Sequence, residues 1–270
     1  MAFVQNQGAK IYWDDEGKGL PILLIMGLGW PSYLWYRTRP VLSARYRTIA
    51  LDNRGVGQSD APPGPYPIAL MAADAAAVLD AAGVKRVHIF GLSMGGMIAQ
   101  EFALQYPNRV QSLILGCTSP GGTHAVLAEP AATQLLFSRG LSPEDFSKAI
   151  NSFIYDSGTP KERIDQDFVL RKRWYPRPEG YIAQLHGILA WEAYSRLPQI
   201  SAPVLVIHGE SDRLVPPANG RIIAERIPGA KLVMIPNASH ILGTDQPDAA
   251  HHAVLEFLAA QSNHPLHMQA

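Results

Sequence analysis

The residue that best fits a nucleophile in this sequence is Ser93, which stands in a Gly-Leu-Ser-Met-Gly segment at residues 91–95. A short apolar run at 87–90 stops at Gly91, and a pattern of helical period begins after the serine, which predicts a strand, a sharp turn and a helix. Gly91 and Gly95 lack a Cβ and so allow the close backbone contacts of such a turn. The turn would expose the Ser93 hydroxyl beside N–H groups that the start of a helix leaves unpaired.

A base must accompany this serine, because a hydroxyl is a weak nucleophile near neutral pH and the base in turn needs an orienting acid. Of nine histidines, His240 follows an expected strand at 231–235 through a short loop, which places it at the carboxyl end of that strand. His208 ends another expected strand and is the alternative, although it precedes the acid loop and is expected to pack beside it. We expect structural or solvated roles for the other histidines, which are His88, His124, His186, His251, His252, His264 and His267.

The orienting acid is expected in the loop at 209–216, which follows the strand at 204–208. Asp212 lies there, and a buried carboxylate bonded to the imidazole would fix the histidine tautomer and stabilise the imidazolium. Glu210 stands two residues nearer the strand and is the rival. From the residues alone both carboxylates stay open.

The elements that must position these side chains alternate between short apolar runs and helical patterns. This alternation predicts a mostly parallel sheet with helices on both faces, whose sites form at the carboxyl ends of the strands. We expect an edge strand at 9–14 and further strands at 22–26, 46–51, 87–90, 110–115, 204–208 and 231–235. We expect helices at 35–44, 70–82, 93–106, 218–226 and 248–260.

Residues 120–198 interrupt the alternation. Four helical patterns, at 131–138, 143–152, 161–173 and 181–194, contain no clear strand between them. We therefore expect a core domain at 1–119 and 199–262, a helical cap or lid inserted at 120–198, and a C-terminal tail at 263–270. Packing of the inserted helices as a separate domain is the alternative.

Composition excludes some classes of protein. The 270 residues are 47% hydrophobic, and 23 Lys plus Arg balance 23 Asp plus Glu, so the chain has no net charge to attract nucleic acid. The single cysteine, Cys117, cannot form an internal disulfide and is expected to be buried.

The chain also lacks several recognisable signals. It shows no basic start followed by an apolar stretch, and no apolar run long enough to span a bilayer, so we expect a soluble, cytoplasmic protein without a membrane partner. It shows no cluster with metal-ligand spacing and no phosphate-binding or dinucleotide fingerprint. We expect neither a metal nor a cofactor. The sequence makes no prediction about oligomeric state.

These motifs together resemble the α/β-hydrolase superfamily. The resemblance is carried by residues 91–95, the Asp-Asn-Arg-Gly-Val-Gly-Gln-Ser loop at 52–59, Gly-Glu-Ser-Asp at 209–212 and Ser-His at 239–240, in order across residues 22–258. It implies Ser93 as nucleophile, His240 as base and Asp212, rather than Glu210, as acid. It also implies that Asp52 and Arg54 are structural and hold a turn behind the site.

One departure concerns the oxyanion loop. Many relatives carry His-Gly after the strand that here ends in Met26 and Gly27, so a methionine replaces the histidine. The family's donors are backbone N–H groups, here those of Leu28 and Met94, and a side-chain change removes neither. The loop has nevertheless lost a possible hydrogen-bonding support, and a missing donor would cost about 2.7–4 kcal/mol of transition-state stabilisation.

The expected reaction is hydrolysis of a small to medium, largely apolar carboxylic ester through an acyl-enzyme on Ser93. Candidate pocket residues are Gly27, Leu28, Trp30, Tyr33, Met94, Phe137, Phe153, Trp174, Trp191 and Ile241, although side chains of these types more often pack in the core.

A carboxylesterase is the leading reading of the sequence. Lactonases, including enol-lactonases, carbon–carbon bond hydrolases and perhydrolases are the alternatives. The serine nucleophile argues against epoxide hydrolases and haloalkane dehalogenases, which use aspartate. A ligand-binding protein that keeps the fold but turns over slowly or not at all is the alternative from a different class.

Overall fold

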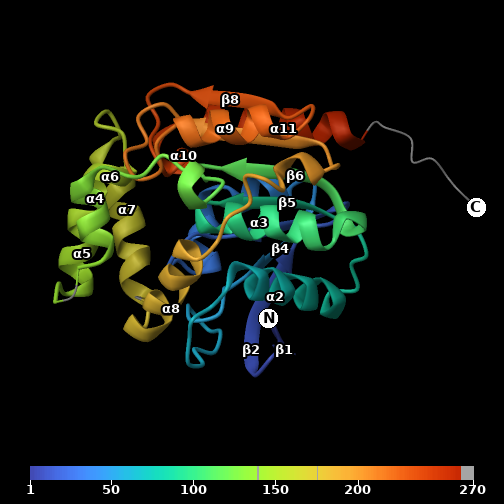
Figure 1. Cartoon of the computed structure of the whole chain (residues 1–270), viewed down its shortest axis with the longest axis horizontal. Coiled ribbons are helices and arrows are strands. Elements are labelled where there is room, and N and C mark those ends of the chain that lie inside the picture. Colours follow the sequence, from blue (N-terminus) through green and yellow to red (C-terminus); the bar gives the residue numbers. More distant parts are fainter. Residues whose placement is uncertain (139, 175, 263–270) are drawn as a thin grey trace, which may run out of the picture.

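A sheet of eight strands forms the centre of the computed structural model, which describes residues 1–138, 140–174 and 176–262 (Figure 1). Its order is β1-β2-β4-β3-β5-β6-β7-β8. The strands are β1 (Ala2–Asn6), β2 (Ala9–Glu16), β3 (Pro21–Ile25), β4 (Arg47–Leu51), β5 (Val87–Leu92), β6 (Val110–Gly116), β7 (Val204–Gly209) and β8 (Lys231–Ile235). Strands β3 to β8 are parallel, so the predicted mostly parallel sheet is confirmed.

The edge of the sheet differs from the prediction. Strand β2 is not the edge, because β1 pairs with it in antiparallel fashion, with Ala2 opposite Trp13. Side chains along β1 alternate between half-buried and exposed, so this strand lacks the continuous apolar run by which the inner strands were recognised.

Helices cover both faces of the sheet, as predicted. Helices α2 (Ile68–Ala81), α3 (Met94–Gln105) and α9 (Ala218–Arg226) pack on one face. Helices α1 (Arg39–Ser43), α10 (Leu242–Asp245) and α11 (Pro247–Ser262) pack on the other. Successive residues of β3 serve the two cores in turn, since side chains alternate across a strand.

The segment between β6 and β7 is helical, and Figure 1 shows it gathered beside one end of the sheet. It contains α4 (Pro130–Leu136), α5 (Pro143–Ala149), α6 (Asn151–Ile154), α7 (Lys161–Arg171) and α8 (Pro178–Leu189), with 3₁₀ helices η3 (Gly122–His124), η4 (Lys172–Trp174) and η5 (Leu197–Gln199). Helix α8 ends earlier than expected, and Glu192 pairs instead with Gly121 in an isolated bridge.

Smaller differences have local causes. The helix expected at 35–44 is divided into a 3₁₀ helix, η1 (Ser32–Arg37), and α1, because Pro40 lies in the first turn of α1 and cannot continue a preceding helix. The 3₁₀ helix η2 (Pro107–Arg109) follows α3. None of the helices in the described ranges combines the length and apolar character of a membrane span. The expected tail at 263–270 lies outside the described residues.

Candidate active site

Ser93 occupies the turn between β5 and α3 in a backbone conformation that is rare for a residue with a side chain. Its φ is +58° and its ψ is −121°. The turn is held by β6 and the residues after it: the N–H of Ser93 donates to Gly116 O at 2.8 Å, and Thr118 Oγ1 donates to Ser93 O at 2.7 Å. Strained backbone of this kind persists only where its surroundings enforce it, and it concentrates at functional sites.

Close backbone contacts hold this turn against the loop that follows β3. A Cβ added to Gly95 would lie 2.0 Å from Ile25 O, so an alanine there would force the backbone to shift. A Cβ on Gly27 would lie 3.4 Å from Ser93 Oγ, so the loop passes directly beside the hydroxyl. Met94 is the first residue of α3, and its N–H therefore has no intrahelical partner. The N–H of Leu28 forms no hydrogen bond within the described residues.

Asp212 and His240 form a buried pair. Asp212 Oδ2 lies 2.8 Å from His240 Nδ1, while Asp212 Oδ1 accepts the N–H groups of Leu214 at 2.9 Å and Val215 at 2.8 Å. Burial alone would raise the pKa of Asp212, but the charge of His240 and hydrogen bonds from His208 and His240 lower it to about 2. The carboxylate is therefore ionised and can act only as an acceptor.

The loop that carries His240 is held from the helical insertion. The N–H groups of His240 and Ile241 both donate to Ile154 O at 3.1 Å, at the end of α6. The loop lies at the same sheet edge as Ser93, because one nitrogen of His240 lies within 4.8 Å of Cys117 Sγ, and Cys117 follows the Gly116 that binds Ser93. Among the described residues, Ser93 Oγ and His240 form no hydrogen bond. A hydrogen bond between a nucleophile and its base often forms only when substrate is bound.

The two rival residues have other positions. His208 is fully buried, with Nε2 lying 2.7 Å from Val215 O and 3.4 Å from Asp212 Oδ2, so it packs beside the acid as expected. Glu210 is exposed to solvent. Asp212 is thus the carboxylate that contacts His240.

Cys117, Asp212 and His240 bring their donor atoms within 4.8 Å of one another, a spacing that could hold a metal ion. The thiol does not fit that role. Burial, and then the charge of Asp212, raise the pKa of Cys117 well above its usual value, whereas a metal ligand must be a thiolate. Its Sγ donates instead to Ser239 O at 3.7 Å. The group therefore favours hydrogen bonding over metal binding.

Two amide side chains support the oxyanion loop where Met26 cannot. Asn53 Nδ2 donates to Met26 O at 2.9 Å, and Gln184 Oε1 accepts the N–H of Gly29 at 2.8 Å. Neither residue was predicted from the sequence. Asn53 lies in the recognised loop at 52–59 and could have been suspected, whereas Gln184 lies in the helical insertion, where no motif marks it.

Hydrogen bonds of Asp52 and Arg54 fix the conformation of the loop at 52–59. Asp52 accepts the N–H groups of Ser32 at 2.7 Å and Gln58 at 2.8 Å. Arg54 is fully buried and donates from Nε to Asp74 at 2.6 Å. These contacts hold the turn behind the oxyanion loop, which is the structural role that the resemblance implies.

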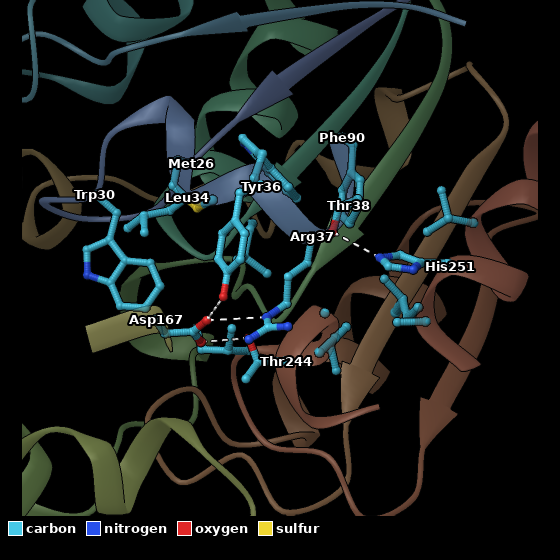
Figure 2. Close-up of a pocket in the computed structure, with 18 of the residues that line it drawn as sticks. Met26, Trp30, Leu34, Tyr36, Arg37, Thr38, Phe90, Asp167, Thr244 and His251 are labelled. Carbon is cyan, nitrogen blue, oxygen red and sulfur yellow. Dashed lines mark hydrogen bonds and ion pairs between the residues drawn. The ribbon is translucent and has the colours of Figure 1, made fainter. Parts of the chain in front are cut away.

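Two of the expected pocket residues, Trp30 and Ile241, line a cavity of about 40 Å³ between the core and α7 (Figure 2). Its lining is mostly apolar and includes Met26 and Leu92, which adjoin Gly27 and Ser93. Ser93 and His240 are not themselves part of this lining. The cavity thus lies next to the loops that carry Ser93 and His240 rather than over Ser93 itself.

Charged residues of α7 close one side of this cavity. Figure 2 shows Tyr36 and Arg37 converging on Asp167, which also accepts from Tyr155 at 2.8 Å and Thr244 at 2.7 Å. The carboxylate therefore has ample partners for its negative charge.

Arg171, one turn further along α7, differs from this carboxylate. Arg171 is only 6% exposed to solvent. Its Nη2 donates to Asn151 Oδ1 at 2.8 Å, but its buried Nε has no partner among the described residues. The guanidinium lies 5.7 Å from the ring centres of Trp30 and Tyr155. It is a buried cation to which no carboxylate of the described residues is bound.

The remaining pocket candidates lie elsewhere. The hydroxyl of Tyr33 donates to Leu170 O at 2.6 Å, and the residue lines a separate polar crevice. Phe137 is 43% exposed at the end of α4, and the ring of half-buried Phe153 lies 5.0 Å from the guanidinium of Arg213. The Leu28 and Met94 side chains pack against the core.

The structure corrects the expectation for Trp191. Its indole is buried in the core with α2 and α3, and Nε1 donates to Glu101 Oε2 at 2.8 Å. Helical spacing shows that an aromatic side chain is buried, but not against what. The side chain of Trp174 lies outside the described residues.

The chain is similar to known proteins over most of its length. A family model described as the alpha/beta hydrolase fold matches residues 21–247. The 2-hydroxy-6-oxo-6-phenylhexa-2,4-dienoate hydrolase of Burkholderia cepacia is 33% identical over 270 residues, covering 93% of this chain and 91% of that protein. The 3-oxoadipate enol-lactonase 2 of Acinetobacter baylyi is 32% identical, covering 84% of each chain.

Among solved structures, a thermophilic esterase from Thermogutta terrifontis superimposes with a TM-score of 0.83. It is 27% identical in sequence, and the match covers 96% of this chain and 98% of the esterase. The names of these similar proteins refer to the hydrolysis of different kinds of bond.

Proposed function

The chain belongs to the alpha/beta hydrolase family, and from that premise we propose that it is a serine hydrolase that cleaves a carboxylic ester through an acyl-enzyme on Ser93. The observation that carries this proposal is the buried Asp212–His240 pair, at the same edge of the sheet as a serine held at a φ of +58°. A paired acid and base serve a nucleophile, whereas a structural histidine needs no ionised carboxylate behind it.

In the proposed reaction, Nε2 of His240 takes the proton from Ser93 Oγ as the oxygen attacks the substrate carbonyl. The N–H groups of Leu28 and Met94 hold the oxyanion of the tetrahedral intermediate. His240 then gives the proton to the leaving alcohol, and the acyl group remains on Ser93. A water molecule, deprotonated by His240, releases the acid and restores the serine. This chemistry needs no metal or cofactor.

The proposed substrate is a small molecule with a largely apolar acyl or alcohol part. Support comes from the apolar walls beside the triad loops, among them Trp30 and Ile241, and from the likeness to an esterase. We further propose that the helical insertion is a cap, since α6 binds the His240 loop and α8 binds the oxyanion loop.

Arg171 favours a second candidate function, the hydrolysis of a lactone or a carbon–carbon bond in a substrate that bears a carboxylate. A buried guanidinium without a charged partner is costly, and a carboxylate is the ligand that its geometry matches. A relative named as a dienoate hydrolase acts, by its name, on such an anion. A ligand-binding protein that turns over slowly remains the alternative outside enzymes.

A serine-directed organophosphonate tests the main proposal. The protein is incubated with the reagent and the adduct is mapped by mass spectrometry, alongside hydrolysis of p-nitrophenyl acetate, butyrate and octanoate. We expect labelling at Ser93 and ester turnover, both lost in Ser93→Ala while the thermal unfolding midpoint stays within a few degrees. A folded wild-type protein that is neither labelled nor active would favour the ligand-binding alternative.

A further inference from the structure

Gln184 connects the helical insertion to the oxyanion loop through two buried hydrogen bonds. The side chain comes from the middle of α8 and is fully buried. Its Oε1 accepts the N–H of Gly29, and its Nε2 donates to Arg54 O, each at 2.8 Å. One amide therefore binds both the oxyanion loop and the loop behind it.

The position of this contact bears on catalysis. Gly29 directly follows Leu28, whose N–H is the proposed oxyanion donor, and Asn53 holds the carbonyl of Met26 on the other side. The Gly27–Leu28 peptide, which carries that donor, thus lies between two restrained groups. A donor contributes fully only when its N–H is already aimed at the developing oxyanion.

We propose that Gln184 is a positioning residue that acts through Gly29 to aim the Leu28 N–H at the oxyanion. This inference rests on the proposed serine hydrolase. The methionine at position 26 leaves the loop without a histidine side chain, and the amide of Gln184 supplies a fixed polar contact from a different part of the chain.

The docking of α8 does not depend on this side chain. The N–H of Tyr66 donates to Ala183 O at 3.0 Å, and a Cβ on Gly180 would lie 2.3 Å from Gly55 O, so backbone meets backbone on both sides. Tyr181 also packs against Gly29. Replacing Gln184 should therefore leave the helix in place and release only the loop.

The test uses Gln184→Met, which is similar in size and removes both hydrogen bonds. Steady-state kinetics on p-nitrophenyl butyrate are measured together with the inhibition constant of a trifluoromethyl ketone, which forms an oxyanion adduct with the serine. We expect Gln184→Met to lower kcat by about 10- to 100-fold, with KM within about threefold, because misaiming a donor weakens only the transition state. The ketone should lose affinity in parallel.

Leu185→Ala is the matched control, since Leu185 is a buried residue of the same helix and its aliphatic side chain forms no hydrogen bond to the loop. This variant should lower the urea unfolding midpoint and leave kcat close to the wild-type value. The positioning role is overturned if Gln184→Met keeps kcat within twofold of an active wild type. If the wild type has no turnover that depends on Ser93, the proposed function and this inference fall together.

Discussion

Oδ2 of Asp212 lies 2.8 Å from Nδ1 of His240, and both residues are buried. The carboxylate, whose pKa lies near 2, can only accept, so the proton of the neutral imidazole must reside on Nδ1. Nε2 is left with its lone pair free to act as a base. The pair therefore selects one tautomer before any substrate arrives.

Asp212→Asn should lower kcat by about 10⁴-fold near pH 8 with little change in KM, because the amide can donate to Nδ1 and so favours the wrong tautomer. Steady-state ester hydrolysis measures this. Glu210→Gln is the control, since Glu210 is exposed, and its kcat should stay within twofold. Near-normal turnover by Asp212→Asn would contradict the proposed triad.

Gly95→Ala should destabilise the protein strongly. The new Cβ would lie 2.0 Å from Ile25 O, a backbone atom in the sheet that cannot rotate away. Overpacking of this kind typically costs about 1–3 kcal/mol, and we expect the free energy of unfolding to fall by about 2 kcal/mol or more. Urea denaturation measures the loss. Gly158→Ala, in an exposed loop, should change the free energy of unfolding by less than about 0.5 kcal/mol.

The sheet, and the placement of the loops that carry Ser93, Asp212 and His240, were predictable because their signals are local. Buried parallel strands are continuous apolar runs, and a glycine-flanked serine after one such run marks its carboxyl end. The loops that carry Asp212 and His240 each follow another run, so the topology of a parallel sheet brings them to one edge. No knowledge of side-chain contacts was needed.

Contacts made by the helical insertion could not be predicted in this way. Gln184 meets Gly29 from 155 positions away in the chain, and Ile154 reaches His240 from α6. Hydrophobic spacing identifies a helix but not the neighbour of each residue. For the same reason, hydrophobic spacing could not show that Trp191 binds Glu101 of α3 instead of lining the cavity of Figure 2.

Asp245→Asn should remove a pH dependence of stability. Asp245 Oδ2 accepts the N–H of Ser239, next to His240, and Oδ1 accepts from Thr159, each at 2.6 Å. Burial raises the pKa of Asp245 to about 6 from 3.8, outweighing these hydrogen bonds. In the folded state the carboxyl thus holds its proton at pH values where the unfolded chain has lost it.

The sign of the effect follows from that shift. The stabilisation is fully present below pH 3.8 and is lost as pH rises through 6, a change of about 3 kcal/mol. Relative to wild type, the free energy of unfolding of Asp245→Asn should therefore rise between pH 4 and pH 7, which urea denaturation at several pH values would measure. Asp248→Asn, on the exposed start of α11, should follow the wild-type curve. A constant difference between Asp245→Asn and wild type would rule out the shift.

Arg171→Met distinguishes the two candidate functions. If the guanidinium binds a substrate carboxylate, kcat/KM for p-nitrophenyl hemisuccinate should fall by about 10- to 100-fold, the cost of about 1.5–3 kcal/mol for a hydrogen bond to a charged group. For neutral p-nitrophenyl butyrate the fall should stay below about threefold. Arg213→Met, which removes an exposed arginine paired with Glu129, should affect neither substrate.

Stability provides a second measurement on the same Arg171→Met variant. Arg171 is buried with an unpartnered Nε, so replacing it with an apolar side chain removes a desolvation cost that no bound anion repays in the free protein. Its urea midpoint should therefore not fall below that of the wild type. If Arg171 is purely structural, its replacement should lower the urea midpoint and reduce activity equally on hemisuccinate and butyrate. That result would eliminate the carboxylate site and leave the apolar ester as the proposed substrate.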